Sequence, residues 1–289
     1  AEHLLHKGHR ISSVVSDCPE VTAWTQKSGT RRIDPSDHLV DLLGKEPFDY
    51  LFSIVNETIR LKDLAALARI ATVNYHDSLL PAYAGFNAHA WAIIDGQTTH
   101  GVTWHKSTAE VHEGAVLLQR DLPVSDDDTA FSLRVAANEA AVRSFQELVA
   151  GLEAGTIVEV APRPVQNYHF KSERPGFAVL DWERPVAELL RLVRALDFGN
   201  QDNWMARAKL RTPAGQYLNI GNASFVPGNS AEIGCIAGLT ADGITVNATG
   251  GGVLLSNLTT LEGETLDVPQ LAEMGLVVGA RLPSTAPDV

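Results

Sequence analysis

The chain has 289 residues, of which 45% are hydrophobic and 20% are charged, and its formal net charge is −12. This is the composition of a soluble globular protein that is long enough for two domains. No apolar run reaches the ~18 residues that a membrane span needs, and an acidic surface repels nucleic acids and anionic lipids. We therefore expect no nucleic-acid partner and no membrane partner. The two distant cysteines, Cys18 and Cys235, are typical of reduced thiols in a cytoplasmic protein.

In the first half of the chain, short apolar runs alternate with helical patterns. Strands are expected at 9–15, 49–55, 70–75, 101–105 and 115–124, and helices at 21–27, 60–69, 87–95 and 128–155. This alternation predicts an α/β domain with a doubly wound, mostly parallel sheet. Residues 1–9 resemble the end of a helix and a turn rather than a natural start, so we expect an upstream segment to be absent.

The pattern changes after about residue 160. Pro162, Pro164 and Pro175 mark a connector, and a helix is expected at 185–196. From Lys209 onward, short apolar segments separated by Gly, Asn and Asp predict a small antiparallel β-barrel of the OB-like kind. We therefore divide the chain into a catalytic domain at 1–165, a connector and helix at 166–205, and a C-terminal barrel domain at 206–289.

The segment 74–85, N-Y-H-D-S-L-L-P-A-Y-A-G, begins where a central strand is expected to end. Ligands of open α/β sheets bind beyond the carboxyl ends of the strands. Asn74 and His76 are two residues apart in a strand and therefore project to the same face. An amide beside an imidazole can stabilise a developing oxyanion and move a proton. By itself an Asn-x-His pair is more often structural than catalytic.

The whole segment resembles the N-x-H-x-S-L-L-P-x-Y-x-G motif of the 10-formyltetrahydrofolate-dependent formyltransferases, which include methionyl-tRNA formyltransferase. H-G-V-T-W-H at 100–105 and the spacing to E-G-A-V-L-L-Q at 113–119 agree with this resemblance. It extends from about residue 9 to 170 and implies a Rossmann-like formyltransferase fold whose first strand is missing here. R-A-L-D-F-G-N at 194–200 is similar, more narrowly, to the formylation domains of nonribosomal peptide synthetases.

The resemblance implies roles for individual residues. Asn74 would hydrogen-bond the oxyanion, and His76 would support it or carry a proton. The formyl donor, 10-formyltetrahydrofolate, would lie between the loop that follows residues 52–56 and the loop 108–112. The implied donor-binding residues are Ile54, Asn56, Thr58, Leu80, Ala109 and Glu110, and the implied substrate-side residues are Ser78, Tyr83 and Gly85.

The chain departs from the family pattern at one catalytic position, where His112 occupies the place of the family's Asp. Three interpretations stay open. Neutral His112 could act as the base, since an ordinary imidazole has a pKa of about 6.5. Glu113 or Glu110 could replace the carboxylate through a local bulge. The domain could also be catalytically impaired or silent and serve for binding within a synthetase.

These features predict an N-formyltransferase that acts on a primary amine. The acceptor is expected to be an amino acid or an aminoacyl group on a carrier protein, with neighbouring synthetase domains as possible partners in nonribosomal peptide and antibiotic biosynthesis. Hydrolysis of the formyl donor, with water in place of the amine, is a further alternative. His89, His100 and His105 lie near the motif but lack the spacing of a metal site, so we expect no metal.

Overall fold

The computed structural model describes residues 1–56, 59, 61–107 and 114–284. The chain forms two compact units. The first comprises Ala1–Ala84, Gly101–Asp121 and Ala137–Gln166, and the second comprises Gly85–His100, Leu122–Ala136 and Asn167–Val289. None of the helices in the described residues combines the length and the apolarity that crossing a lipid bilayer requires.

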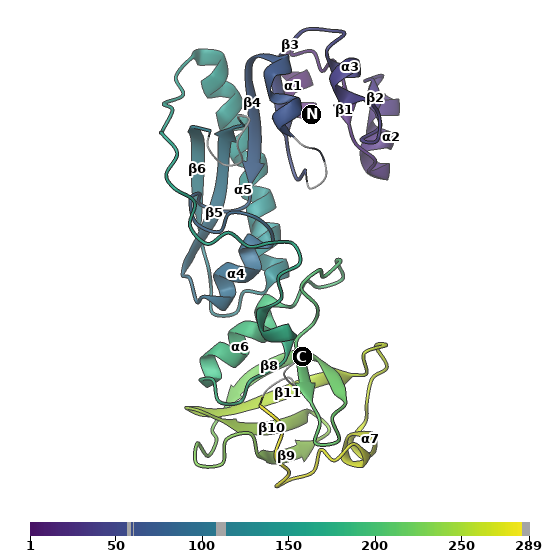
Figure 1. Ribbon diagram of the computed structural model, residues 1–289, viewed down its shortest axis with the longest axis vertical. Coiled ribbons are helices and arrows are strands. Elements are labelled where there is room, and N and C mark those ends of the chain that lie inside the picture. Colours follow the sequence, from purple (N-terminus) through teal and green to yellow (C-terminus); the bar gives the residue numbers. More distant parts are fainter. Residues whose placement is uncertain (57–58, 60, 108–113, 285–289) are drawn as a thin grey trace. The chain divides into compact units, whose positions relative to one another are not determined.

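The first unit is built on a four-stranded sheet in the order β3-β4-β5-β6 (Figure 1). Its strands are β3 (Phe48–Ser53), β4 (Ala68–His76), β5 (Thr99–Lys106) and β6 (Val116–Pro123). β3 and β4 run parallel, whereas β4 and β5 run antiparallel. The Lys106 amide at the end of β5 donates to the Ala115 carbonyl, directly before β6, at 2.8 Å. The expected mostly parallel sheet is therefore a mixed sheet, because β5 runs antiparallel to β4.

Two further strands precede this sheet. β1 (Val14–Val15) pairs in parallel with β2 (Arg32–Ile33), so only the end of the expected strand at 9–15 is extended. The three short helices of this region are α1 (Glu2–His6), α2 (Pro19–Ser28) and α3 (Leu39–Leu43). A small apolar core holds the region together, with Ile33, Leu39, Leu43 and Leu64 buried against Val15 and Leu51 among others.

The α-helix expected at 60–69 is not formed. Two 3₁₀ turns, η1 (Leu61–Asp63) and η2 (Ala65–Leu67), lead directly into β4. The Leu64 amide donates to the Leu61 carbonyl and the Leu67 amide to the Leu64 carbonyl, both at 3.0 Å. Leucines spaced by three residues suit a helix with three residues per turn better than one with 3.6. The leucine spacing that suggested an α-helix is thus satisfied by tighter turns.

The long helix α5 (Ala130–Ala154) was expected at 128–155, and its second half packs against the sheet of the first unit. The Trp104 indole of β5 donates to the Ser144 hydroxyl at 2.9 Å. Phe145 contacts Phe52 of β3 edge to face, with ring centroids 5.2 Å apart. One face of β4 and β5 is therefore closed by α5, and polar side chains on these strands gather on the other face.

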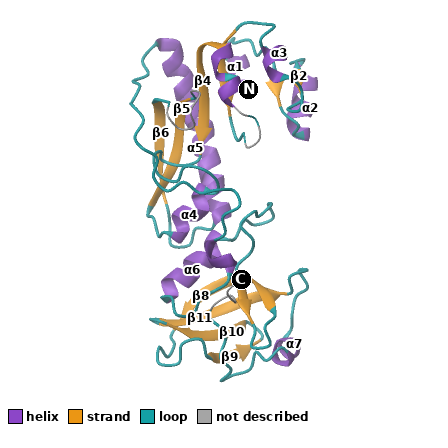
Figure 2. Ribbon diagram, viewed as in Figure 1, coloured by secondary structure: helices purple, strands orange, loops and turns teal. Residues whose placement is uncertain are grey.

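The second unit contains the helices α4 (Ala88–Ile94), α6 (Val186–Ala195) and α7 (Val268–Glu273), the turn η3 (Pro175–Ala178) and the first residues of α5. Its five-stranded antiparallel sheet has the order β7-β8-β11-β10-β9 (Figure 2). The strands are β7 (Lys209–Arg211), β8 (Tyr217–Val226), β9 (Ile236–Thr240), β10 (Gly243–Ala248) and β11 (Gly251–Thr259). The antiparallel arrangement is confirmed, whereas closure into a barrel stays a prediction, as do the three domain boundaries.

Candidate functional site

The last residues of β4 carry the two side chains that the motif singled out. Asn74 and His76 lie on one face of the strand, with Tyr75 between them on the other. In the register with β5, Asn74 is opposite His105 and His76 is opposite Thr103. Residues directly opposite in an antiparallel pair share a face. Four polar side chains of β4 and β5 therefore share one face, on the side of the sheet away from α5.

Asn74 and His105 are joined by a hydrogen bond of 3.2 Å between the Asn74 Nδ2 and the His105 Nε2. The His105 Nδ1 lies 2.9 Å from the carbonyl oxygen of Lys106. A carbonyl oxygen only accepts, so Nδ1 carries the proton and Nε2 accepts from the amide. Burial lowers the pKa of His105 to about 4, and the neighbouring His76 acts in the same direction. His105 is therefore neutral near pH 7.

His76 is only 8% exposed, and its Nε2 lies 3.1 Å from the carbonyl oxygen of Tyr83. Since that oxygen only accepts, Nε2 donates, and Nδ1 is the acceptor nitrogen of the neutral ring. Tyr83 has a φ of 53°, in the left-handed region. The loop after β4 thus turns back sharply, and its carbonyl fixes the orientation of the imidazole.

A second set of hydrogen bonds holds the loop itself. The fully buried Thr103 hydroxyl donates to the Ser78 carbonyl at 2.6 Å and accepts from the Leu80 amide at 3.1 Å. The Gln119 side-chain amide on β6 donates to the Thr103 hydroxyl and to the Leu80 carbonyl, both at 2.9 Å. The loop S-L-L-P is therefore clamped to β5 and β6 beside the Asn74–His76 face.

The residue Gly101 allows this close packing. A Cβ at this position would lie 2.3 Å from the Arg120 carbonyl oxygen and 2.6 Å from the Leu79 side chain. No real Cβ makes contacts this short, so the backbone of β5 can approach the loop only where the side chain is hydrogen. The second residue of H-G-V-T-W-H is thereby explained by packing rather than by chemistry.

The substrate-side residues have differing surroundings. Ser78 is fully buried, and its hydroxyl donates to the Ala82 carbonyl at 2.7 Å, so it holds the turn. Gly85 belongs to the second unit, where it has a φ of 99° and forms a bridge with His169. A Cβ on Gly85 would lie 2.2 Å from the His169 carbonyl oxygen. His169 in turn stacks on Trp91, with ring centroids 4.0 Å apart.

Among the expected donor-binding residues, Ile54 is 49% exposed directly after β3. The Asn56 side chain is bound to the Ile59 backbone, since it accepts from the Ile59 amide at 2.8 Å and donates to the Ile59 carbonyl at 2.9 Å. Leu80 is held in the clamped loop. The remaining expected residues, Thr58, Ala109, Glu110 and the catalytic position His112, lie outside the described residues.

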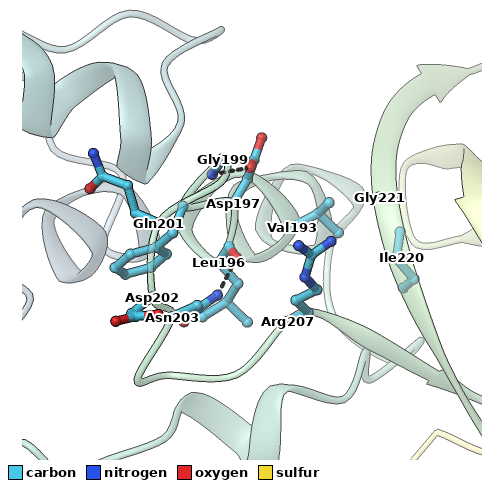
Figure 3. Close-up of a pocket in the computed structure, with 11 residues that line it drawn as sticks. Val193, Leu196, Asp197, Gly199, Gln201, Asp202, Asn203, Arg207, Ile220 and Gly221 are labelled. Carbon is cyan, nitrogen blue, oxygen red and sulfur yellow. Dashed lines mark hydrogen bonds between the residues drawn. The ribbon is translucent and has the colours of Figure 1, made fainter. Parts of the chain in front are cut away.

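A hollow of about 300 Å³ lies in the second unit (Figure 3). It is formed by the end of α6, the following segment and β8, including Asp197, Asn203 and Arg207. The Asn203 side chain donates to the Leu196 carbonyl at 2.7 Å and so fixes one wall. This hollow contains part of the R-A-L-D-F-G-N segment, but none of the expected site residues lines it.

Sequence reasoning missed His105, Thr103 and Gln119 as parts of the site. H-G-V-T-W-H was recognised as a motif, but the partners of its side chains depend on the register between β4 and β5. The signal was available in the spacing, because Thr103 and His105 alternate in the same way as Asn74 and His76. Within the ranges that the structure describes, no group of three or more His, Cys, Asp or Glu residues could hold a metal ion.

Residues 59–149 match the family model described as "Formyl transferase". Over 91% of its length the chain superposes on HypX from Aquifex aeolicus in complex with tetrahydrofolic acid, with a TM-score of 0.61 and 19% identity, and it spans 46% of that protein. It also resembles WlaRD, a sugar 3N-formyl transferase solved with dTDP and 5-N-formyl-THF, with a TM-score of 0.65, 12% identity and coverage of 88% and 91% of the two chains.

A third similar structure is a 4-N formyltransferase from Francisella tularensis, with a TM-score of 0.58 and 18% identity. The superposition covers 68% of this chain and 79% of that one. The stretch that matches the family model contains β4, β5, β6 and the motif loop. Residues 59–149 therefore match the formyl transferase family model, and the chain shares the fold of these proteins.

Proposed function

We propose that the protein transfers a formyl group from 10-formyltetrahydrofolate to the nitrogen of a primary amine. The observation that carries this proposal is the pairing of Asn74 and His76 on one face at the end of β4, each with its orientation fixed by a hydrogen bond. When an amine attacks a formyl carbon, an amide N–H can stabilise the negative charge on the formyl oxygen, and an imidazole nitrogen can accept the proton of the amine.

In the proposed reaction, the amine nitrogen attacks the formyl carbon, and the formyl oxygen gains negative charge. One N–H of Asn74 is engaged by His105, and the second N–H donates to the formyl oxygen. The Nδ1 of His76 accepts a proton from the attacking nitrogen and returns it to the folate nitrogen as the carbon–nitrogen bond breaks. Loss of a single oxyanion donor lowers rates by about 100–1000-fold, which sets the expected contribution of Asn74.

The residues at the end of β3 support the donor side of the proposal. Ser53, the last residue of β3, is opposite Asn74 in the parallel pair, and the next two side chains, Ile54 and Val55, are 49% and 63% exposed. Two exposed apolar side chains beside a polar site suit the flat face of a pterin ring. The further donor contacts that we propose are Asn56, Thr58, Leu80, Ala109 and Glu110, and the acceptor would meet Ser78, Tyr83 and Gly85.

For the acceptor, we propose an amino acid or a carrier-bound aminoacyl group, as in nonribosomal peptide and antibiotic biosynthesis, with neighbouring synthetase domains as partners. The R-A-L-D-F-G-N segment favours this choice. The similar structures include a sugar formyl transferase, so an amino sugar is the competing acceptor class.

We further propose a division into domains, in which residues 1–165 perform the chemistry and residues 206–289 form an OB-like barrel. Residues 166–205 connect these two domains. Reduced Cys18 and Cys235 suit a cytoplasmic location.

The second candidate is a catalytically silent binding domain, and the observation in its favour is His112 at the family's Asp position. A general acid–base group contributes about 100–10,000-fold to a rate, so its replacement can abolish turnover.

The discriminating experiment is a single-turnover assay with 10-formyltetrahydrofolate and separate panels of amino acids, aminoacyl carrier proteins and amino sugars. The unmodified protein and His112→Asp are compared. Equal formylation by both proteins supports the active enzyme. Near-zero transfer by the unmodified protein with strong rescue by His112→Asp supports the silent domain. Formate release without any amine identifies hydrolysis of the donor instead.

A further inference from the structure

We propose that His105 is a positioning residue that orients the Asn74 carboxamide so that an N–H, rather than the carbonyl oxygen, meets the formyl oxygen. This inference rests on the proposed function for its catalytic consequence, whereas its structural part concerns the resting protein. Three groups form a chain of hydrogen bonds with a single direction: the Lys106 carbonyl, the His105 imidazole and the Asn74 amide.

The direction of this chain is fixed at its first member. The Lys106 carbonyl can only accept, so the nitrogen 2.9 Å from it, the His105 Nδ1, must carry the proton. In a neutral ring the other nitrogen, Nε2, then has a lone pair and no hydrogen. The Asn74 Nδ2 lies 3.2 Å from that lone pair and donates to it. The backbone of β5 thereby selects the tautomer, and the tautomer selects the rotation of the amide.

The opposite rotation of Asn74 is disfavoured. A flipped carboxamide would place its oxygen against the lone pair of Nε2, with two acceptors facing each other. Since the ends of a carboxamide have nearly the same shape, packing alone would not separate the two rotations. His105 therefore supplies the difference. One N–H of Asn74 points to His105, and the planar geometry of the amide sets the direction of the second N–H.

The arrangement requires His105 to stay neutral. A protonated ring would donate from Nε2 and would favour the flipped amide. The side chain is 3% exposed, and burial is the main cause that lowers its pKa to about 4. In the described part of β4 and β5, the groups that share its face are Asn74, His76 and Thr103, and none of these three is an anion. The acceptor nitrogen is thus maintained near pH 7.

The direct test is ¹⁵N NMR of the protein labelled in the histidine side chains, without substrate, with His105→Gln used to assign the resonance. We expect a neutral ring that is protonated on Nδ1 and unprotonated on Nε2 at pH 7. A ring protonated on Nε2, or a charged ring, overturns the proposal. This measurement needs no turnover, so it separates failure of the inference from failure of the proposed function.

The kinetic test compares His105→Leu with His105→Gln. Leu has no acceptor, and we expect it to lower kcat for formyl transfer about 10–100-fold, with KM for the folate changed less than threefold. This decrease is smaller than the about 100–1000-fold decrease in rate that follows complete removal of an oxyanion donor. Gln can place a carboxamide oxygen near the position of Nε2, and we expect it to recover at least half of that loss on a logarithmic scale.

Ser144→Ala is the matched control, since it removes a buried hydrogen bond to the neighbouring Trp104 on the opposite face of β5. It should lower Tm while kcat stays within threefold of the unmodified protein. If His105→Leu lowers kcat no more than Ser144→Ala at a similar loss of Tm, or if Gln fails to exceed Leu, His105 acts only in packing and the proposal is refuted.

Discussion

The clamp on the motif loop can be broken by a single substitution, Thr103→Val. The two side chains have nearly the same shape, but Val lacks the hydroxyl that donates to the Ser78 carbonyl and accepts from the Leu80 amide. Gln119 loses one of its two acceptors and keeps the Leu80 carbonyl. Thr103 is fully buried, so water cannot readily replace the lost partner.

The expected cost follows from the groups that lose their partners. The Ser78 C=O loses a buried hydrogen bond and the Leu80 N–H a partly buried one, at about 1–3 kcal/mol per group. Thr103→Val should therefore lower the free energy of unfolding by about 2–6 kcal/mol, a large part of the 5–15 kcal/mol of a typical domain. Thr103→Ser keeps the hydroxyl and removes one methyl group, which should cost about 1 kcal/mol.

Urea unfolding followed by tryptophan fluorescence measures both variants, because Trp104 is the buried neighbour of Thr103 on β5. The displaced loop also carries the carbonyl that orients His76, so Val should lower formyl transfer more than Ser does. If the unfolding free energies of Val and Ser differ by less than about 0.5 kcal/mol, Thr103 is not the clamp that its hydrogen bonds indicate.

Two further predictions concern stability. Lowering the pH from 7 to about 4 should reduce the unfolding free energy by about 3 kcal/mol through His105, because its imidazole gains a proton below pH 6.5 in the unfolded chain but only near pH 4 in the folded protein. Denaturation at several pH values measures this dependence. If the unfolding free energy of His105→Gln falls with pH as steeply as that of the unmodified protein, the prediction is contradicted. Gly85→Ala should cost more than about 2 kcal/mol by calorimetry, since a Cβ would lie 2.2 Å from a carbonyl oxygen. Gly155→Ala, with φ of 65° and open space around the Cβ, is the control that should cost about 1 kcal/mol.

Most regular elements could be predicted because their patterns are local. The apolar run at 49–55 and the helical pattern at 128–155 correspond to β3 and α5 with shifts of one or two residues. The α-helix expected at 60–69 was wrong, because leucines spaced by three residues suit 3₁₀ turns better than an α-helix. The mixed sheet was also missed, since the direction of β5 relative to β4 depends on pairing rather than on composition.

The candidate site shows the same division between local and non-local information. The shared face of Asn74 and His76 follows from strand periodicity alone. The bond from Asn74 to His105 and the role of Thr103 depend on a register between residues about thirty positions apart, which no local pattern specifies. The tautomer of His105 depends in addition on the Lys106 carbonyl, a backbone group that the residue types do not reveal.

The measurement that tests the account most directly is single-turnover formyl transfer by Asn74→Ala, with the binding of a folate analogue measured on the same protein. We predict a rate at least about 100-fold below that of the unmodified protein, with the dissociation constant of the analogue changed only slightly. A variant that transfers the formyl group at the unmodified rate would show that the Asn74–His76 face is not where the chemistry takes place.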